Sequence, residues 1–545
     1  MGRVKDKKLL MVCIALFVLQ MTVCIVVDSQ KGRFHCDEVY SYGLSSCLEY
    51  PFINNTTVRE LGYNGWVDSS FFKDYVTIGS DETFSLKAAY DNQVLDVHPP
   101  MYYFILYTIC YLTGGEFTKW TGLILNLFLL ALLDIVLYYI GLYILKDKYK
   151  ALIPVMFWSL SSAGLSNIVF IRMYVLLTLE LAVFVAIHIK ALKDKNAFSV
   201  KWYLVIFINV IMGGLTHYYY YPFVFFFGAP ICVIILSHKQ FLNLLKYIAA
   251  LLGGFAFNLT VFPGTIHHVF GGYRGTEVIN NLGARGEAVF ANAYLPWINN
   301  SMFGGLLFPI LIVLVIMLPV AFFVSRRYSK ETNGVMIEQE PYRMVKRIDN
   351  RTVILFLIVL ASYMFSFIAI QGSGLKTNRY LYPVYPYYAL IMIKLICVVL
   401  EKLTKKKAVH YVVVSAFTVL VCVLSIVNNK VENLYSEYDA VVENIQDLKG
   451  RDCIIYYKNS WLDVYSTITM SFDMDETYFL KPEEMESLEI ILDGRKTKDE
   501  LVVWIQSEID EEETAEIMNE IIKHTEYSRY ELKINYLTQV FELIK

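Results

Sequence analysis

Long apolar runs are the feature of this 545-residue sequence that most restricts its fold. The runs reach about 20 residues, which is the length that an α-helix needs to cross the hydrocarbon core of a bilayer. Because a bilayer offers no water to the backbone, only helices and closed barrels can span it. The runs therefore predict an α-helical polytopic membrane protein with about 11–13 spans.

The first predicted span follows a basic N-terminus and covers Leu9–Val27. No small-residue cleavage site of the A-x-A type follows it, so we expect a retained span rather than a signal peptide. Met101–Thr113 has only about half to two-thirds of the length of a crossing. We expect either that it enters the membrane and returns or that a neighbouring span is merged or missed. The remaining expected spans are Phe117–Leu145, Ala151–Ile171, Met173–Ile189, Trp202–Thr216, Tyr218–Leu236, Leu244–Phe262, Ser301–Val324, Val353–Ile370, Tyr380–Leu400 and Val409–Val427.

Basic residues between the spans predict the orientation of the chain. They gather at 146–148, 190–201, 238–239, 326–351 and 402–407, and loops rich in Lys and Arg are typically cytoplasmic. This places two extracytoplasmic loops at 28–98 and 263–300, together with the C-terminal segment. No endoplasmic-reticulum retention signal ends the chain at 542–545, which favours a bacterial plasma membrane.

The C-terminal segment, 431–545, differs in composition from the transmembrane domain, 1–430. It is charged, and strand-like runs at Cys453–Tyr457, Leu501–Ile505 and Leu532–Tyr536 flank a helical pattern at Glu512–His524. These patterns predict a small soluble α/β domain. It contains no G-x-G-x-x-G, P-loop or G-x-S-x-G motif, which favours a structural cap or a recognition role.

Charge and cysteine content exclude some functions. The net charge of −3 argues against a nucleic-acid partner. The nine cysteines form no C-x-x-C pair and no Cys/His spacing typical of zinc. Cys36 and Cys47 share the first loop and are expected to form a disulfide if that compartment is oxidising.

Polar residues that interrupt the apolar pattern gather at the predicted outer ends of the spans. They begin with the acids Asp37, Glu38 and Asp96 and continue with His98, Arg172, His217 and Arg379. Carboxylates near lipid are costly and are usually functional or paired. Each residue also has a structural explanation, because arginine can snorkel to headgroups, a histidine can be hydrogen-bonded in a core, and tyrosines form interface belts.

Together these groups suit transfer of a sugar from a lipid phosphate. An acceptor hydroxyl is a poor nucleophile, so a carboxylate must take its proton. The phosphate leaving group gains negative charge as the sugar bond breaks, and arginines stabilise that charge.

The order of motifs resembles the GT-C superfamily of integral-membrane glycosyltransferases, in the branch of protein O-mannosyltransferases and the lipid A aminoarabinose transferase. The resemblance covers roughly residues 1–430. It is carried by Asp37-Glu38, Asp96-x-His98-Pro99-Pro100-Met-Tyr-Tyr, Arg172-Met-Tyr174, His217-Tyr218-Tyr-Tyr and Arg379-Tyr-Leu-Tyr382-Pro383.

The resemblance implies an inverting enzyme that uses a polyprenyl-phosphate-linked sugar on the extracytoplasmic face. Asp37 matches the loop acid that is the proposed base, and Asp96 resembles the second acid. His98, Arg172, Tyr174, His217, Tyr218, Arg379 and Tyr382 are then the expected substrate-binding residues. Some members of the superfamily need a divalent cation, which Asp37, Glu38 and Asp96 can hold, although the spacing does not require one.

Two departures from the family leave the sugar and the acceptor open. The aminoarabinose branch has a lysine where this chain has His98, and the C-terminal segment lacks the β-trefoil pattern of eukaryotic protein mannosyltransferases. The acceptor is therefore a cell-envelope polymer, a lipid or a protein. Two other functions fit the same residues, namely a transporter or flippase of a lipid-linked or small polar substrate, and a non-catalytic protein that binds polyprenyl phosphate.

Overall fold

The computed structural model describes residues 2–61, 65–193, 198–283, 289–332, 349–443, 445–458, 465, 467–493, 501–506, 509–536 and 538–545. Parts of three expected loops, 194–197, 284–288 and 333–348, lie outside these residues. Contacts divide the chain into two units. The helical unit comprises Met1–Asp28, Val97–Tyr102 and Leu123–Glu432, and the mixed unit comprises Ser29–Asp96, Tyr103–Gly122 and Asn433–Lys545.

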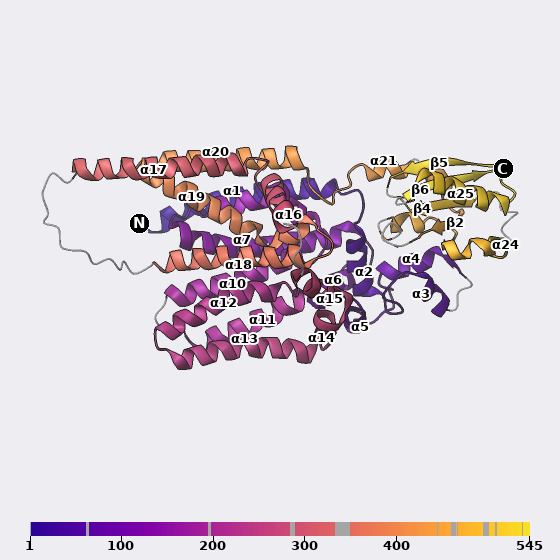
Figure 1. The fold of residues 1–545 in the computed structure, drawn as a ribbon, viewed down its shortest axis with the longest axis horizontal. Coiled ribbons are helices and arrows are strands. Elements are labelled where there is room, and N and C mark those ends of the chain that lie inside the picture. Colours follow the sequence, from indigo (N-terminus) through magenta and orange to yellow (C-terminus); the bar gives the residue numbers. More distant parts are fainter. Residues whose placement is uncertain are drawn as a thin grey trace. The chain divides into compact units, whose positions relative to one another are not determined.

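Nine of the described helices are long and apolar enough to cross a membrane, which confirms a polytopic helical membrane protein. They are α1 (Gly2–Ser29), α7 (Lys119–Leu145), α10 (Tyr174–Lys193), α12 (Tyr220–Ser237), α13 (Phe241–Val261), α17 (Leu307–Thr332), α18 (Asn350–Gly372), α19 (Tyr385–Leu403) with the preceding turn η3 (Asn378–Val384), and α20 (Lys407–Asn429). Figure 1 shows many of these helices running side by side in the helical unit.

The expected span Ala151–Ile171 is broken rather than continuous. Helices α8 (Leu152–Ser159) and α9 (Ser162–Val169) meet at 67°. The Ser161 side chain caps α9 by accepting the Gly164 N–H, and a Cβ on Gly164 would lie 2.0 Å from the Trp158 carbonyl oxygen. Because serine competes for backbone hydrogen bonds and glycine permits this close approach, the local sequence favours a bend over a straight helix.

Two further apolar helices are short. Helix α11 (Val200–Thr216) has 17 residues and α6 (Met101–Leu112) has 12. At 1.5 Å per residue α6 is about 18 Å long, so it cannot cross a core about 30 Å thick by itself. Among the described residues, the nine long helices, the bent pair and α11 together reach 11 spans, the lower end of the expected 11–13.

Short helices occupy the two long loops. The first contains α2 (Cys36–Ser46), α3 (Asn55–Glu60), α4 (Ser69–Val76) and α5 (Lys87–Leu95), and also the strand β1 (Trp66–Asp68). The second contains α14 (Gly264–Ile266), η1 (His267–Gly271), α15 (Tyr273–Gly283), α16 (Val289–Trp297) and η2 (Ile298–Met302).

The C-terminal segment forms the expected α/β structure. Its sheet has the order β1-β3-β2-β4-β6-β5, with β2 parallel to β3 and β4 and the other pairs antiparallel. The strands are β2 (Asp452–Tyr456), β3 (Glu476–Leu480), β4 (Leu501–Gln506), β5 (Arg529–Asn535) and β6 (Thr538–Ile544). Strands β2 and β4 are buried at every position, as expected for central parallel strands.

The remaining elements of this segment are short helices around the sheet, with one longer helix. They are α21 (Tyr438–Glu443), η4 (Gln446–Leu448), α23 (Ile468–Ser471), η5 (Pro482–Ser487), α24 (Leu488–Ile491) and α25 (Glu511–Lys523). Apolar residues of α25, among them Ile517, Met518 and Ile521, share a buried core with the sheet.

The first loop belongs to the same compact unit as the C-terminal segment, unlike the expected division at 430/431. Strand β1 pairs with β3, with Trp66 opposite Tyr478, so the loop supplies an edge strand of the sheet. The expected disulfide does not form, because Cys36 and Cys47 are both free. Cys36 begins helix α2 and Cys47 is its C-cap, so about 16 Å of helix axis separates them, far beyond the reach of a disulfide.

Candidate functional site

Asp37 and Glu38 lie in the first turn of α2, within the mixed unit. His35 is the N-cap, and its Nδ1 accepts the Asp37 N–H at 3.1 Å, while Glu38 Oε2 accepts the His35 N–H at 2.6 Å. This is a capping box in which a histidine takes the place of the usual serine or threonine. The positive end of a helix dipole stabilises negative charge, so this position suits a carboxylate such as Asp37.

The two neighbouring acids have different surroundings. The Asp37 side chain is 22% exposed, whereas the Glu38 side chain is fully buried and forms an ion pair with Lys31 at 2.9 Å. Lys31 Nζ also donates to the Asn433 carbonyl at 2.7 Å. Glu38 therefore fixes the start of α2, and Asp37 is the more accessible acid.

Asp96 caps the C-terminal end of α5, which packs against α2 in the mixed unit. Its N–H donates to the Asn92 carbonyl at 3.0 Å, and Asn92 Nδ2 donates to the Leu44 and Cys47 carbonyls of the segment that carries α2. Among the described residues, the side chains that can hold a metal ion gather at His35, Cys36 and Asp37, with ligand atoms within 4.8 Å of one another. Asp96 is not part of that group.

A second set of predicted residues comes together in the helical unit, around His217 at the end of α11. The His217 ring lies 5.8 Å from the ring of His98 and 6.0 Å from that of Tyr174, and Tyr174 lies 6.1 Å from Tyr382. Burial lowers the pKa of His217 well below its ordinary value, and the charges of His98 and Arg172 lower it further. At neutral pH His217 is therefore an uncharged hydrogen-bonding group.

The two predicted arginines belong to the same unit. Arg172 follows the broken span, is 4% exposed and acts electrostatically on His217. The Arg379 guanidinium lies 5.6 Å from the Phe170 ring and 5.8 Å from the Tyr380 ring. Phe170 and Arg172 directly follow the second helix of the broken span. The broken span therefore supplies one side of the cluster formed by His98, His217 and the two arginines.

The sequence did not single out Glu432, which supports the arginine-bearing segment. Its carboxylate accepts hydrogen bonds from Asn378 Nδ2 at 2.7 Å and from the Tyr382 hydroxyl at 2.8 Å, and its N–H donates to Ser166 Oγ at 2.9 Å. Asn378 and Tyr382 flank Arg379 in η3. The available signal was weak, because Glu432 lies just beyond the last apolar run and resembles an ordinary loop acid.

Two neighbouring tyrosines, the predicted Tyr218 and the unpredicted Tyr219, have different surroundings. The Tyr218 hydroxyl bonds His268 Nδ1 at 2.8 Å, whereas it is the Tyr219 ring that lies 4.8 Å from His217 and 5.8 Å from Tyr380. A run of four tyrosines has no periodicity that tells which ring turns inward.

In the mixed unit, a C-terminal tyrosine packs against α2. The buried Tyr465 ring lies 4.2 Å from Tyr40, one helical turn after Asp37. The Tyr465 hydroxyl donates to the Ile53 carbonyl at 3.0 Å and accepts the Ile53 N–H at 2.7 Å. The C-terminal segment therefore helps to hold the loop that carries the predicted base.

No protein-family model and no curated protein matches this sequence. Solved structures do match. ArnT from Cupriavidus metallidurans bound to undecaprenyl phosphate aligns over 97% of both chains, with a TM-score of 0.50 and 12% identity. Its apo state aligns over 97% of this chain and 98% of the other, with a TM-score of 0.51 and 11% identity. The chain therefore has an ArnT-like fold over nearly its whole length, in agreement with the fold expected from the motifs.

Proposed function

We propose that this protein is an inverting glycosyltransferase. It moves a sugar from a polyprenyl-phosphate-linked donor to an acceptor hydroxyl at the outer face of the membrane. The observation that carries the proposal is the cluster of two arginines and two imidazoles in the helical unit, in a fold shared with an ArnT structure that holds undecaprenyl phosphate.

Each group has a defined part in this chemistry. Arg172 and Arg379 neutralise the phosphate as it becomes the leaving group, and arginine suits this because its guanidinium forms paired hydrogen bonds to phosphate oxygens. His98 and the uncharged His217 donate hydrogen bonds to the same headgroup. Tyr174 and Tyr382 wall the cluster with aromatic rings.

Asp37 removes the proton from the acceptor hydroxyl. Its partial exposure leaves it accessible to a substrate, while the start of α2 favours its ionised form. Asp96 and Glu38 support this position, Asp96 from the end of α5 and Glu38 through Lys31.

The test compares the envelope of cells that lack the gene with cells complemented by variants. Intact-mass and lipid profiling should show a hexose or pentose increment that is lost without the gene. Wild type and Asp91→Asn should restore it, because Asp91 is an exposed acid that pairs with Lys87 on the surface of α5. Asp37→Asn should reduce transfer roughly 10²–10⁴-fold, the usual contribution of a general base.

The same purified proteins then provide the decisive kinetic measurement. Near-normal turnover by Asp37→Asn, at equal amounts of folded protein, would exclude Asp37 as the base. Transport of the donor lipid across the liposome membrane, with no acceptor becoming glycosylated, would instead identify a flippase.

A further inference from the structure

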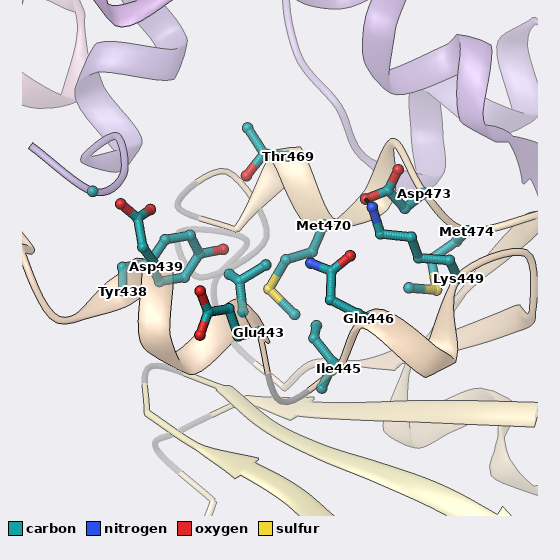
Figure 2. Close-up of a pocket in the computed structure, with 12 residues that line it drawn as sticks. Tyr438, Asp439, Glu443, Ile445, Gln446, Lys449, Thr469, Met470, Asp473 and Met474 are labelled. Atoms are coloured by element: carbon teal, nitrogen blue, oxygen red, sulfur yellow. Dashed lines mark ion pairs between the residues drawn. The ribbon is translucent and has the colours of Figure 1, made fainter.

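The mixed unit contains a hollow of about 400 Å³ whose walls come from the first loop and the C-terminal segment. Its polar side chains are Tyr438, Asp439, Glu443, Gln446, Lys449, Thr469 and Asp473, and we call it the acidic hollow because three carboxylates and one ammonium group line it (Figure 2). Met470, Met474 and Ile445 give it an apolar side. A volume in the range of roughly 300–1,000 Å³ with a few polar groups is typical of small-molecule sites.

We propose that the acidic hollow binds a neutral saccharide portion of the acceptor. This inference rests on the proposed function and names the chemical class of the acceptor. Mixed hydrogen-bonding side chains beside an apolar wall suit a sugar ring, which presents hydroxyls at its edge and C–H groups on its face.

The carboxylates determine which ligands can enter. Asp439 and Glu443 are exposed, lie four residues apart on α21, and have no ion-pair partner within the part of the chain that the structure describes. Asp473 is paired with Lys449 at 3.0 Å. Ionised carboxylates only accept hydrogen bonds, so the ligand must donate, and phosphate or uronate groups are repelled.

Tyr438 favours a ligand that presents a hydroxyl group over one that presents an ammonium group. The side chain is 3% exposed, and its hydroxyl lies beside Thr469 without a hydrogen bond of normal geometry to any described residue. Figure 2 shows this hydroxyl turned toward the other lining side chains. A buried O–H needs an acceptor, which an ammonium group lacks and a sugar hydroxyl provides while it donates to a carboxylate.

The wall of the hollow also includes a residue of the segment that leads into α2. Gly32 forms part of its wall, and its N–H donates to the Leu434 carbonyl at 2.9 Å. The preceding residue, Lys31, forms the ion pair with Glu38, next to Asp37 in the first turn of α2. A saccharide held in the hollow therefore lies beside Gly32, four residues before the start of the helix that carries Asp37.

The experiment measures saccharide binding without donor lipid. Full-length protein in detergent is applied to an array of neutral, amino-substituted and uronic-acid oligosaccharides. We expect wild type to retain neutral oligosaccharides, Asp439→Asn/Glu443→Gln to lose at least tenfold in affinity, and Tyr438→Phe to lose several-fold. The matched control is Glu512→Gln/Glu516→Gln, two exposed acids at the same spacing on α25, which should bind like wild type.

The outcomes separate this inference from the proposed function. Failure of wild type to bind any neutral saccharide, equal binding by the Asp439/Glu443 double variant, or preference for amino or uronic-acid sugars would overturn the subsite. Asp37→Asn should bind the array like wild type while it fails to transfer sugar. Transfer that persists in a protein without saccharide binding would refute the subsite alone.

Discussion

The buried ion pair between Lys31 and Glu38 allows a sharp test of what Glu38 does. Both side chains are fully buried at 2.9 Å from each other. Glu38→Gln keeps the size of the side chain but removes the negative charge that faces the Lys31 ammonium, which also donates to the Asn433 carbonyl. Removing one member of a buried ion pair costs about 3–5 kcal/mol, because an uncompensated charge remains.

The double variant Lys31→Met/Glu38→Gln should recover most of that loss. It removes both charges, and the glutamine oxygen can still accept the His35 N–H that Glu38 accepts at 2.6 Å. Replacing a whole buried pair with uncharged groups of similar size is often close to neutral. The cycle therefore predicts a strong coupling between the two positions, with each single variant less stable than the double.

Amide hydrogen exchange across α2 of the full-length protein in detergent provides the measurement. A loss of about 3–5 kcal/mol corresponds to roughly a hundredfold to a few thousandfold faster exchange through local opening. Glu49→Gln, an exposed acid just beyond α2, is the control and should leave exchange unchanged. Unchanged exchange in Glu38→Gln, with sugar transfer abolished in both single and double variants, would show that Glu38 acts on the substrate and refute the structural role.

Three further predictions follow from the same units. Trp66→Ala should destabilise the sheet by about 3–5 kcal/mol, seen as faster exchange in β3, because Trp66 is in its core and bonds the Ile491 carbonyl at 3.1 Å; unchanged exchange would contradict the pairing of β1 with β3. Glu432→Gln should lower kcat/KM for the donor about tenfold or more, since Asn378 and Tyr382 lose an ionised acceptor beside Arg379; normal kinetics would exclude that support. Burial alone would raise the pKa of Glu542, but hydrogen bonds from Lys533 and Arg451 outweigh it and lower the pKa below 4.5. The stabilisation is therefore complete above pH 4.5 and is lost as pH falls through the lowered pKa, and limited proteolysis of the C-terminal segment should show this acid sensitivity in wild type and not in Glu542→Gln.

The sequence by itself determined the elements whose signal is local. Runs of about 20 apolar residues identified the long helices, because a bilayer accepts only backbone that satisfies its own hydrogen bonds. Strands β2 and β4 were recognisable as short apolar runs between turns. The order of polar motifs also indicated that His98, Tyr174, His217 and Tyr382 belong together, and they do lie around one another in the helical unit.

Tertiary structure decided the pairings that have no local signal. Trp66 donates a hydrogen bond to the Ile491 carbonyl, which lies 425 positions away in the sequence. The three residues of β1 are too few for a periodic pattern that would predict a strand in a distant sheet. Glu38 was expected among the functional acids and Glu432 looked like an ordinary loop acid, and only their partners Lys31, Asn378 and Tyr382 reveal that both support neighbouring segments. The physical reason is that the free energy of a buried carboxylate depends on the groups that the folded chain places around it. Helix and strand patterns depend instead on residues that are near neighbours along the chain.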